Sequence, residues 1–528
     1  MGVKLAKKTV GADELSKNLK EISVAEFFEK NRHLLGYENT TKSMLTVLKE
    51  LVDNSIDACE EAGILPDIKV SVKPTTENKY MIKVEDNGPG IVEEKLSLAF
   101  GKFLYGSKFH RLRQARGTQG IGVAGAILYS QLTTGKPVKL TSSTGKDVTE
   151  MKMTIDVVKN QPHVISTEKT KNPKKWHGIK IEMEIEGRYI EKGQSIPEYL
   201  KQTAIMNPYA KIIYNGPNGK NVFERVTKEI PHMPKEIKPH PYGVELGILR
   251  RMARTSKDKN MKMFLRKNFS RVGGSSADQM LKMAKIDEKT KPLQLSHKDI
   301  VSLHEAMQKV KLIAPSTDCL SQLGEELIEK GLNKEIQAEH FVSITRSPTV
   351  YRGRPFAVEV GLAYGGELSP NSQAELLRFA NKVPLMYHQG DCAITEAVKE
   401  LDWRRYGLQQ SSGSMPTGPL LILVHFASVW VPFTSEGKQA IASYPEIIKE
   451  IKLALQDAGR KLKVFISKKR RRKEQEMRQN LFEKYIPEVA LGLEKLSGEK
   501  KEKIIKDLEK ILKKENDNGD KNEKGKGE

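Results

Sequence analysis

The sequence predicts an α+β protein of several domains, and three observations lead to this fold class. The chain has 528 residues, whereas a typical domain has about 100 to 200, so about three or four domains are expected. Helical periodicity in the first part gives way to alternating strands, which is typical of an α+β sandwich. Helical and strand patterns then return in turn, which predicts further domains behind the sandwich.

The composition excludes several classes of protein. No apolar run reaches the ~18–20 residues that a membrane-spanning helix needs, so no membrane contact is expected. Residues 1–10 lack the apolar region of a signal peptide, which predicts a cytoplasmic protein. Cys59, Cys319 and Cys392 lie far apart, which argues against a disulfide framework or a cysteine-based zinc site.

Two helices and a sheet are expected to form the first domain. Apolar residues recur every three or four positions between Ser16 and Gly63, a typical helix stop. The stretch 96–125 is punctuated by glycines and is longer than a simple connection, so it is expected to carry function. Alternating apolar and polar residues predict half-buried strands of a largely antiparallel sheet, beginning near Ile68, Tyr80, Val138, Thr149 and Gly178.

A helical module and a second α/β domain are expected in the second half. The pattern is helical over 242–312, and strand patterns resume over 340–366 and 419–433. Helical spacing then runs from about Gly437 past Leu481 and predicts a long exit helix. Beyond about Ser497 the chain is dense in charge, which predicts a short helix followed by disorder.

The first functional signal is a pair of side chains on the second helix. Glu50 and Asn54 are four residues apart, so both project from the same helical face. A carboxylate there can take a proton from water while the amide oxygen holds a hard cation such as Mg²⁺. By itself, such a pair is more often part of a solvated surface.

The second signal is Asp86 at the end of a strand, followed by Gly88 and Gly90. Glycines two apart let the backbone turn sharply and approach a ligand closely. The Asp86 carboxylate can accept a hydrogen bond from an exocyclic amine. A tight turn with a capping aspartate has the same pattern, and the ligand spacing of a calcium loop is not matched.

The third signal is a glycine-rich loop that runs into an apolar helix. Its free N–H groups and the positive end of the helix dipole would bind phosphate oxygens. A dinucleotide-binding loop needs a strand directly before it, whereas residues 103–119 are basic and polar, and no GxxxxGK[ST] motif occurs. The loop comprises Gly117, Thr118, Gln119, Gly120, Ile121, Gly122 and Val123.

In this order, the three signals resemble the N-box, the DxGxG box and the lid of the GHKL ATPases. The resemblance implies a Bergerat-type sandwich that binds ATP and Mg²⁺. It gives Glu50 the role of the base that activates water, Asn54 that of the Mg²⁺ ligand and Asp86 that of the adenine-reading carboxylate. A base at Glu50 favours hydrolysis over phosphotransfer. The other contacts implied are Gly88 and Gly90 near adenine, Ser107 and Lys108 in the lid, and residues 117–123 around the phosphates.

The second half resembles the B subunits of type IIB DNA topoisomerases. Residues 250–274 are similar to that family's helix-two-turns-helix insert, and residues 379–385 and 431–442 are similar to its transducer domain. Lys438 matches the switch lysine, a point cation on a glycine-flexed loop that reaches the γ-phosphate. The domains implied are an ATPase domain at 1–240, the helical insert at 241–317, the transducer with its long helix at 318–490, and a charged, partly disordered tail at 491–528.

The charge of the chain predicts a polyanionic partner. Lys and Arg number 89 against 67 Asp and Glu, a net charge of +22, which is typical of proteins that bind nucleic acid. Nine basic residues lie between Arg250 and Arg271 with Asp258 as the one acid between them, and a second basic run spans 467–473. Both runs predict contacts with the backbone of double-stranded DNA. A solvated helix face or an acidic protein would explain the second run equally well.

No region remains for a fold that carries a cleaving tyrosine, so strand cleavage is expected from a separate chain that docks near 481–490. The resemblance implies an A2B2 heterotetramer, associated with the nucleoid, in which ATP makes two of these chains dimerise around DNA. An ATP-gated clamp or chaperone without DNA chemistry is the alternative from another class, and a mismatch-repair ATPase is the enzymatic one. For residues 1–20, an exchanged strap and a frayed terminus fit equally well.

Overall fold

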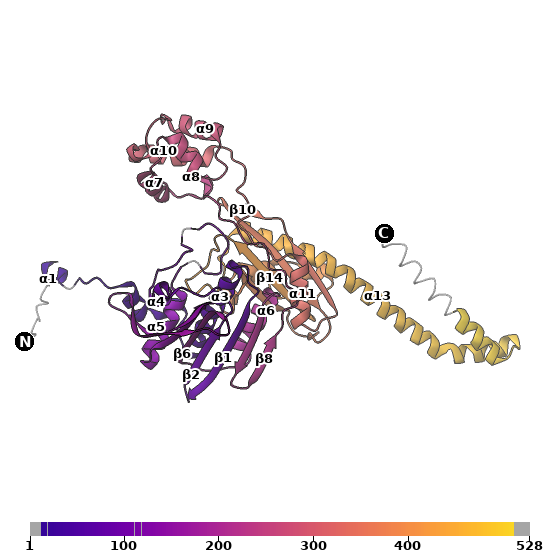
Figure 1. Cartoon of the computed structure of the whole chain (residues 1–528). Helices are drawn as coiled ribbons and strands as arrows, with labels where there is room; N and C mark the ends of the chain where they lie inside the picture. The colour runs from indigo at the N-terminus through magenta and orange to yellow at the C-terminus, as the bar shows by residue number, and fades with distance from the viewer. Residues whose placement is uncertain (1–11, 18, 110, 118, 512–528) are drawn as a thin grey trace, which may run out of the picture. The chain divides into compact units, whose positions relative to one another are not determined.

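The computed structural model describes residues 12–17, 19–109, 111–117 and 119–511 (Figure 1). It divides into two compact units. The first, Met1–Asp402 with Gln410–Ala458, contains two β-sheets and a helical module. The second, Trp403–Gln409 with Gly459–Glu528, contains most of a long helix. Within the described part of the chain, no helix is long and apolar enough to cross a bilayer.

An eight-stranded sheet dominates the first part of the chain. Its order is β5-β4-β3-β6-β2-β1-β7-β8, and all neighbours are antiparallel except β1 and β7. The predicted antiparallel sheet is therefore confirmed. Sequence patterns missed β5, β7 and β8, and β5 is an edge strand that is exposed on nearly every residue. The strands are β1 (Asp67–Thr76), β2 (Lys79–Glu85), β3 (Val138–Thr144), β4 (Asp147–Asp156), β5 (Gln161–Lys171), β6 (His177–Glu186), β7 (Lys211–Gly216) and β8 (Gly219–Phe223).

Helices pack on this sheet, with α3 (Thr40–Glu61) against β2 and α5 (Gly122–Thr134) against β6. The side chain of Asn39 caps α3 by accepting a hydrogen bond from the Lys42 N–H, and Gly63 follows its end at φ 68°. Leu48, Val52, Ile56 and Cys59 are fully buried at a spacing of three or four residues, which is the stripe that predicted the helix. The other helices are α1 (Ala12–Ser16), α2 (Val24–Lys30), α4 (Glu93–Gly101) and α6 (Ile196–Met206).

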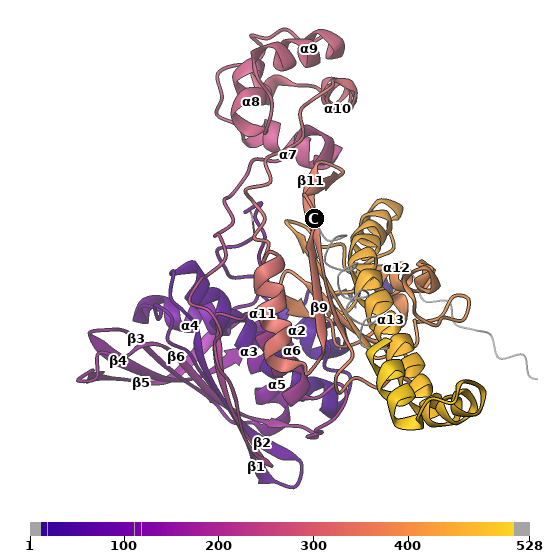
Figure 2. The same cartoon turned by 90° about the vertical axis from the view of Figure 1, so that its right-hand side faces the viewer.

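The predicted helical module is confirmed and has a hydrophobic core of its own. Its helices are α7 (Leu246–Thr255), α8 (Met261–Asn268), α9 (Gly274–Ala284) and α10 (His297–Lys309). Phe264, Leu303 and Met307 are among its fully buried side chains. Figure 2 shows these four helices grouped together, with two chain segments leading to the rest of the first unit.

A second, six-stranded sheet follows and is covered by α11 (Glu325–Glu335). Its strands run in the order β10-β11-β14-β12-β13, with β9 also paired to β11. The apolar run near 419–433 forms a fully buried strand, as predicted, with His425 inside it. The elements are β9 (His340–Thr345), β10 (Thr349–Tyr351), β11 (Arg354–Tyr364), β12 (Glu375–Ala380), β13 (Val383–Pro384), β14 (Leu420–Ser428) and the helix α12 (Ala393–Glu400).

The predicted start of the exit helix is wrong. Helix α13 spans Pro445–Ser497 rather than beginning near Gly437. The segment before it folds back on itself, because the N–H of Thr434 donates to the carbonyl of Ala440 at 3.0 Å. Proline at the first helical position then favours a start at residue 445. Residues 501–511 form the short helix that was expected, whereas the predicted disorder falls on 512–528, outside the described residues.

The contact between α6 and α11 joins the two sheets and depends on a glycine. A Cβ atom at Gly331 would lie 2.1 Å from the carbonyl oxygen of Ile205. We therefore expect Gly331→Ala to separate the two helices and to lower stability by about 1–3 kcal/mol, the usual cost of overpacking. Thermal unfolding of the full chain measures this.

Gly247→Ala is the matched control, because nothing lies within 4 Å of a Cβ at that position on α7. Its stability should change by no more than about 1 kcal/mol, in the stabilising direction. Equal unfolding midpoints for the two variants would contradict the packing account.

Candidate functional site

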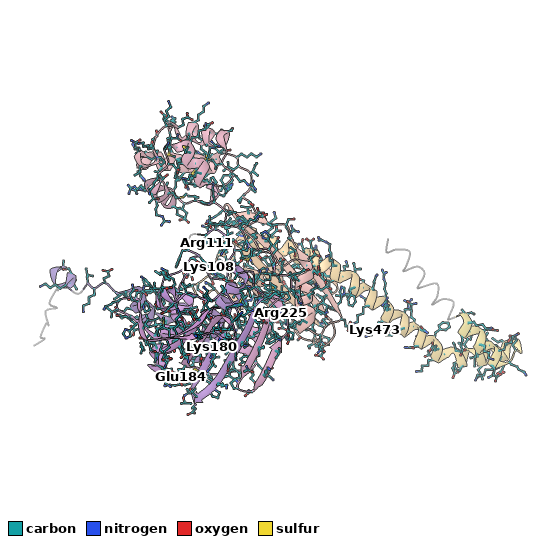
Figure 3. The ribbon with its side chains drawn as sticks, in the orientation of Figure 1. Lys108, Arg111, Lys180, Glu184, Arg225 and Lys473 are labelled. Atoms are coloured by element: carbon teal, nitrogen blue, oxygen red, sulfur yellow. The ribbon has the colours of Figure 1, made fainter. Side chains whose placement is uncertain are left out.

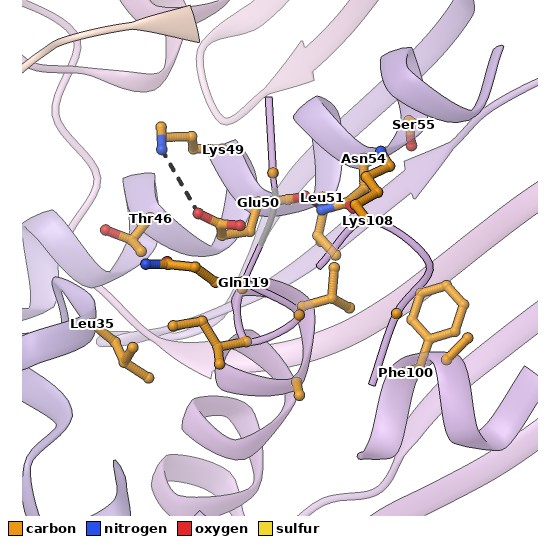
Figure 4. Close-up of a pocket in the computed structure, with 18 of the residues that line it drawn as sticks. Leu35, Thr46, Lys49, Glu50, Leu51, Asn54, Ser55, Phe100, Lys108 and Gln119 are labelled. Carbon is orange, nitrogen blue, oxygen red and sulfur yellow. Dashed lines mark hydrogen bonds and ion pairs between the residues drawn. The ribbon is translucent and has the colours of Figure 1, made fainter. Parts of the chain in front are cut away.

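A cavity of about 600 Å³ opens between α3, α4, the loop before α5 and a loop that leads to α13. Figure 4 shows part of its wall, in which Glu50, Asn54, Lys108 and Gln119 are labelled. Residues far apart in sequence therefore meet in one place. The cavity lies within the first unit and brings together nearly all of the site residues that the sequence predicted.

Helix α3 directs Glu50 and Asn54 into the cavity, as their spacing predicted. The amide nitrogen Nδ2 of Asn54 donates to the backbone carbonyl of Glu50 at 2.6 Å. This fixes the amide so that Oδ1 is left without a hydrogen bond to any described residue. The Glu50 side chain is one-fifth exposed, and its Oε1 lies 3.7 Å from the Nζ of Lys49 (Figure 4).

The first residue of α5 lies directly against the Glu50 carboxylate. A Cβ atom at Gly122 would stand 1.8 Å from Oε2 of Glu50, so glycine alone fits here without displacing the carboxylate. The N-cap residue Ile121 offers no capping side chain, which leaves the first N–H groups of α5 to an outside acceptor. The helix dipole makes this end attractive to phosphate.

Asp86 follows β2 at the inner wall and is only 4% exposed. Its Oδ1 accepts hydrogen bonds from the N–H groups of Gly88 at 2.9 Å and Ile179 at 3.0 Å, and its Oδ2 accepts one from the Ser55 hydroxyl at 3.0 Å. Burial raises the pKa of Asp86, and these three donors oppose the rise. The carboxylate is thus rigidly oriented, with acceptor capacity left on Oδ2.

The two glycines after Asp86 have different places. Gly90 lines the cavity with φ 72°, and a Cβ there would lie 2.1 Å from the carbonyl oxygen of Ser143. Gly88 is not among the described residues of the cavity wall. Instead, the N–H of Gly88 donates a hydrogen bond to the carboxylate of Asp86. Gly88 therefore supports Asp86 in this structure, and its place in the turn on the adenine side stays a prediction.

The predicted lid residues also reach the cavity. Ser107, Lys108, Gly117 and the stretch 119–123 line it, whereas Thr118 lies outside the described residues. The Nζ of Lys108 pairs with Asp57 at 2.7 Å. Burial lowers the pKa of Lys108, but Asp57 and Glu61 outweigh it and raise that pKa overall. Lys108 is therefore held by α3 in this conformation.

Lys438 enters the cavity from the loop between β14 and α13. Its backbone is left-handed at φ 52°, which is costly for a lysine. Burial lowers the pKa of its amine, and the Glu50 carboxylate opposes this. Glu436, two residues before Lys438, accepts a hydrogen bond from the side chain of Gln119. The loop therefore contacts the glycine-rich loop directly.

Sequence reasoning missed Lys49, Glu436 and the cavity-lining residues Met386 and Tyr387. Met386 and Tyr387 follow β13, and no motif connects them with α3. Lys49 adjoins Glu50, but adjacent helical residues point in different directions, so helical spacing did not select it. These residues can be recognised only from the folded structure, which brings them to the cavity wall.

The sandwich and its cavity define an ATPase domain of the GHKL type, and residues 42–182 match the family model for the histidine kinase-, DNA gyrase B- and HSP90-like ATPases. Residues 315–478 match the model for the topoisomerase VI B subunit transducer.

Three relatives that match along most of this chain are each described as the B subunit of type 2 DNA topoisomerase 6. The one from Methanosarcina acetivorans is 45% identical over 95% of this chain and 80% of the relative. The relative from Archaeoglobus fulgidus is 46% identical over 89% of this chain and 78% of the relative. The one from Pyrococcus horikoshii is 42% identical over 95% of this chain and 96% of the relative. The chain belongs to this family, the B subunits of type 2 DNA topoisomerase 6. The predicted fold class and topoisomerase family are thereby confirmed, and the domain boundaries stay predictions.

Replacing Asp86 should selectively weaken adenine nucleotides. We expect Asp86→Ala to cost about 1–3 kcal/mol of ATP affinity, because the exocyclic amine loses its buried acceptor. Equilibrium titration with ATP and with GTP measures this, and Ser55→Ala is the control that removes only the supporting hydroxyl and should cost less. Unchanged affinity for ATP, or equal weakening for GTP, would contradict the role.

Proposed function

We propose that this chain is the ATP-binding and ATP-hydrolysing subunit of a type IIB topoisomerase. The observation that carries the proposal is the meeting of Glu50 and Lys438 at one cavity. Glu50 lies on α3, which packs on the eight-stranded sheet, whereas Lys438 belongs to the second sheet's domain, by which we mean α11, strands β9–β14 and the segments that flank them. Family membership supports the ATPase activity. A nucleotide in this cavity would touch both domains at once.

Each side chain has a physical role in the proposed hydrolysis. Glu50 takes a proton from the attacking water, while the N–H groups at the start of α5 and the Lys438 amine stabilise negative charge on the γ-phosphate. Asp86 accepts a hydrogen bond from the adenine amine. The Glu50 carboxylate favours the charged form of the Lys438 amine, and a γ-phosphate in this cavity would favour it in the same way.

Asn54 fits the role of a Mg²⁺ ligand. Its Oδ1 is free among the described residues and belongs to the oxygen class that Mg²⁺ prefers. No group of three or more His, Cys, Asp or Glu in the described ranges could hold a metal by itself. Asn54 would hold Mg²⁺ through this oxygen, and the ion, when bound, would supply positive charge that neutralises nucleotide phosphates.

Glu50→Ala tests the proposed base. ATP turnover should fall by about 10²–10⁴-fold, the usual contribution of a positioned base, while ATP affinity is retained because the loop, Asp86 and Lys438 remain. Steady-state hydrolysis measures the turnover, and equilibrium binding on the same preparation measures the ATP affinity. Turnover within threefold of the unmodified chain would remove Glu50 from this role.

DNA is the proposed partner of the helical module. Asp258 is the one acid between Arg250 and Arg271, but the fold brings further acids to these cations from outside that stretch. Lys262 pairs with Asp278 at 2.7 Å and lies 3.6 Å from Glu288. Lys267 pairs with Asp258 at 3.3 Å. The cations that remain exposed without an ion pair to a described residue include Arg250, Arg251 and Arg254 on α7 and Arg266 on α8.

Helix α13 supplies the proposed contacts with other macromolecules. The basic run 467–473 is largely exposed, and Figure 3 labels Lys473 on this helix. Further on, Leu481, Phe482 and Tyr485 are each more than half exposed. We propose that this apolar segment is the docking site for the cleavage subunit, which is the A subunit of topoisomerase VI. The two kinds of subunit would form an A2B2 heterotetramer that acts on nucleoid DNA in the cytoplasm.

ATP binding is proposed to drive dimerisation of two such chains around a DNA segment, and the second sheet's domain passes this closure to the cleavage subunit. This requires that ATP bind the closed dimer more tightly than the open chain. Residues 1–20 fit an exchanged strap and a frayed terminus equally well, and most of them, residues 1–11 and 18, lie outside the described residues.

The salt dependence of DNA binding tests the module. Replacing Arg250, Arg251 and Arg254 with glutamine should reduce the slope of log K against log salt by up to about 0.9 per lost phosphate contact. Lys262 and Lys267, which already pair with acidic residues of the same module, are the matched controls, and their replacement should change the slope less. A slope unaffected by the arginine changes would place the DNA site elsewhere.

A further inference from the structure

The glycine-rich loop is held at its entrance by four residues, Arg113–Arg116, which directly precede Gly117. On one side, the Arg116 guanidinium pairs with Asp57 and with both carboxylate oxygens of Glu60, at 2.6–2.9 Å. The Arg116 side chain is only 4% exposed. A bidentate, buried pair of this kind fixes geometry as well as charge.

On the other side, the same four residues are held by the domain of the second sheet. The side-chain amide of Gln114 accepts a hydrogen bond from the Ser321 N–H at 2.7 Å and donates to the Ser321 carbonyl at 3.2 Å. The amide of Asn381 donates to the carbonyl of Ala115 at 2.9 Å. Gln114 is 6% exposed, so these bonds form away from water.

Lys382 joins the two sides. Its amine lies 3.2 Å from the Ser321 hydroxyl, 3.5 Å from the Tyr209 hydroxyl and 4.0 Å from the Glu60 carboxylate. Burial lowers the pKa of Lys382, and Glu60 opposes this. Burial would raise the pKa of Glu60, but Arg116 and Lys382 lower it to about 2.

The backbone at Lys382 is itself unusual. Asn381 and Lys382 connect β12 to β13 with φ values of 49° and 68°. A two-residue turn of this kind favours Asn followed by Gly, so lysine at the second position costs of order 1 kcal/mol or more. A strained, fully buried lysine points to a role for its amine beyond forming the turn.

We propose that Gln114 and Lys382 are positioning residues for the nucleotide reaction. Through their hydrogen bonds they hold the entrance of the glycine-rich loop against the domain that also carries Lys438. This deepens the proposed function and rests on it. The second sheet's domain then touches the nucleotide site twice, through Lys438 in the cavity and through the loop entrance behind it. A shift of that domain moves both contacts together.

The consequence is selectivity for the γ-phosphate. ADP would use Asp86 and the nearer part of the loop, whereas ATP needs the loop and Lys438 placed correctly at the same time. Loosening the loop entrance should therefore weaken a triphosphate more than a diphosphate. A structural role alone would weaken both equally, through loss of folded protein.

The test compares full chains by titration with a non-hydrolysable ATP analogue and with ADP, each with Mg²⁺. For Lys382→Met, the preference for the ATP analogue over ADP should fall by about fivefold or more, the lower range of typical coupling between sites. Gln114→Ala should shift the preference in the same direction and serves as the second variant if Lys382→Met does not fold.

Lys334→Met is the matched control. This lysine lies on α11 in the same domain, burial lowers the pKa of its amine, and its amine lies 3.2 Å from Glu335 and 5.9 Å from the ring of Phe223. Its ATP-to-ADP preference should stay within twofold of the unmodified chain. Equal preferences for Lys382→Met, Gln114→Ala and the control would overturn the inference and leave the proposed function standing. Failure of the unmodified chain to bind either nucleotide would overturn both.

Discussion

The packing of α3 on the eight-stranded sheet is the constraint on which the rest of the site depends. Its apolar stripe, from Leu48 to Cys59, is fully buried, and burying each such side chain contributes about 1.5–3 kcal/mol. With that stripe fixed, the helix can present its polar residues in one orientation only. Glu50 and Asn54 then face the cavity, Ser55 holds Asp86, and Asp57 and Glu60 hold the entrance of the glycine-rich loop.

Close backbone approach is the second requirement, and it explains which parts of the site could be predicted. Glycine spacing indicated a phosphate loop and a turn after Asp86 from sequence alone, since both need a flexible backbone. That Gly122 must lack a side chain because of Glu50, 72 positions earlier, follows only from the fold. The start of α13 was misplaced for a similar reason, because pairing between Thr434 and Ala440 overrides helical spacing.

Contacts between domains were the least predictable part. Lys438 was found through its resemblance to a switch lysine, whereas Lys382, which is more deeply buried, sits in a turn with no recognisable signal. Local patterns describe a residue's own element, and the partners of Lys382 come from α3, the segment before α11 and the residues after α6. The same limit applies to the ion pairs of Lys262, whose acidic partners Asp278 and Glu288 lie outside its own helix.

We propose that nucleotide bound in this cavity brings two of these chains together. Sedimentation of the purified full chain with a light-absorbing, non-hydrolysable ATP analogue and Mg²⁺ tests it most directly, because bound nucleotide and protein mass are read in one run. The account predicts a monomer without nucleotide and, with it, a species of twice the mass that carries the analogue. Nucleotide sedimenting with a monomer at saturating analogue would contradict it.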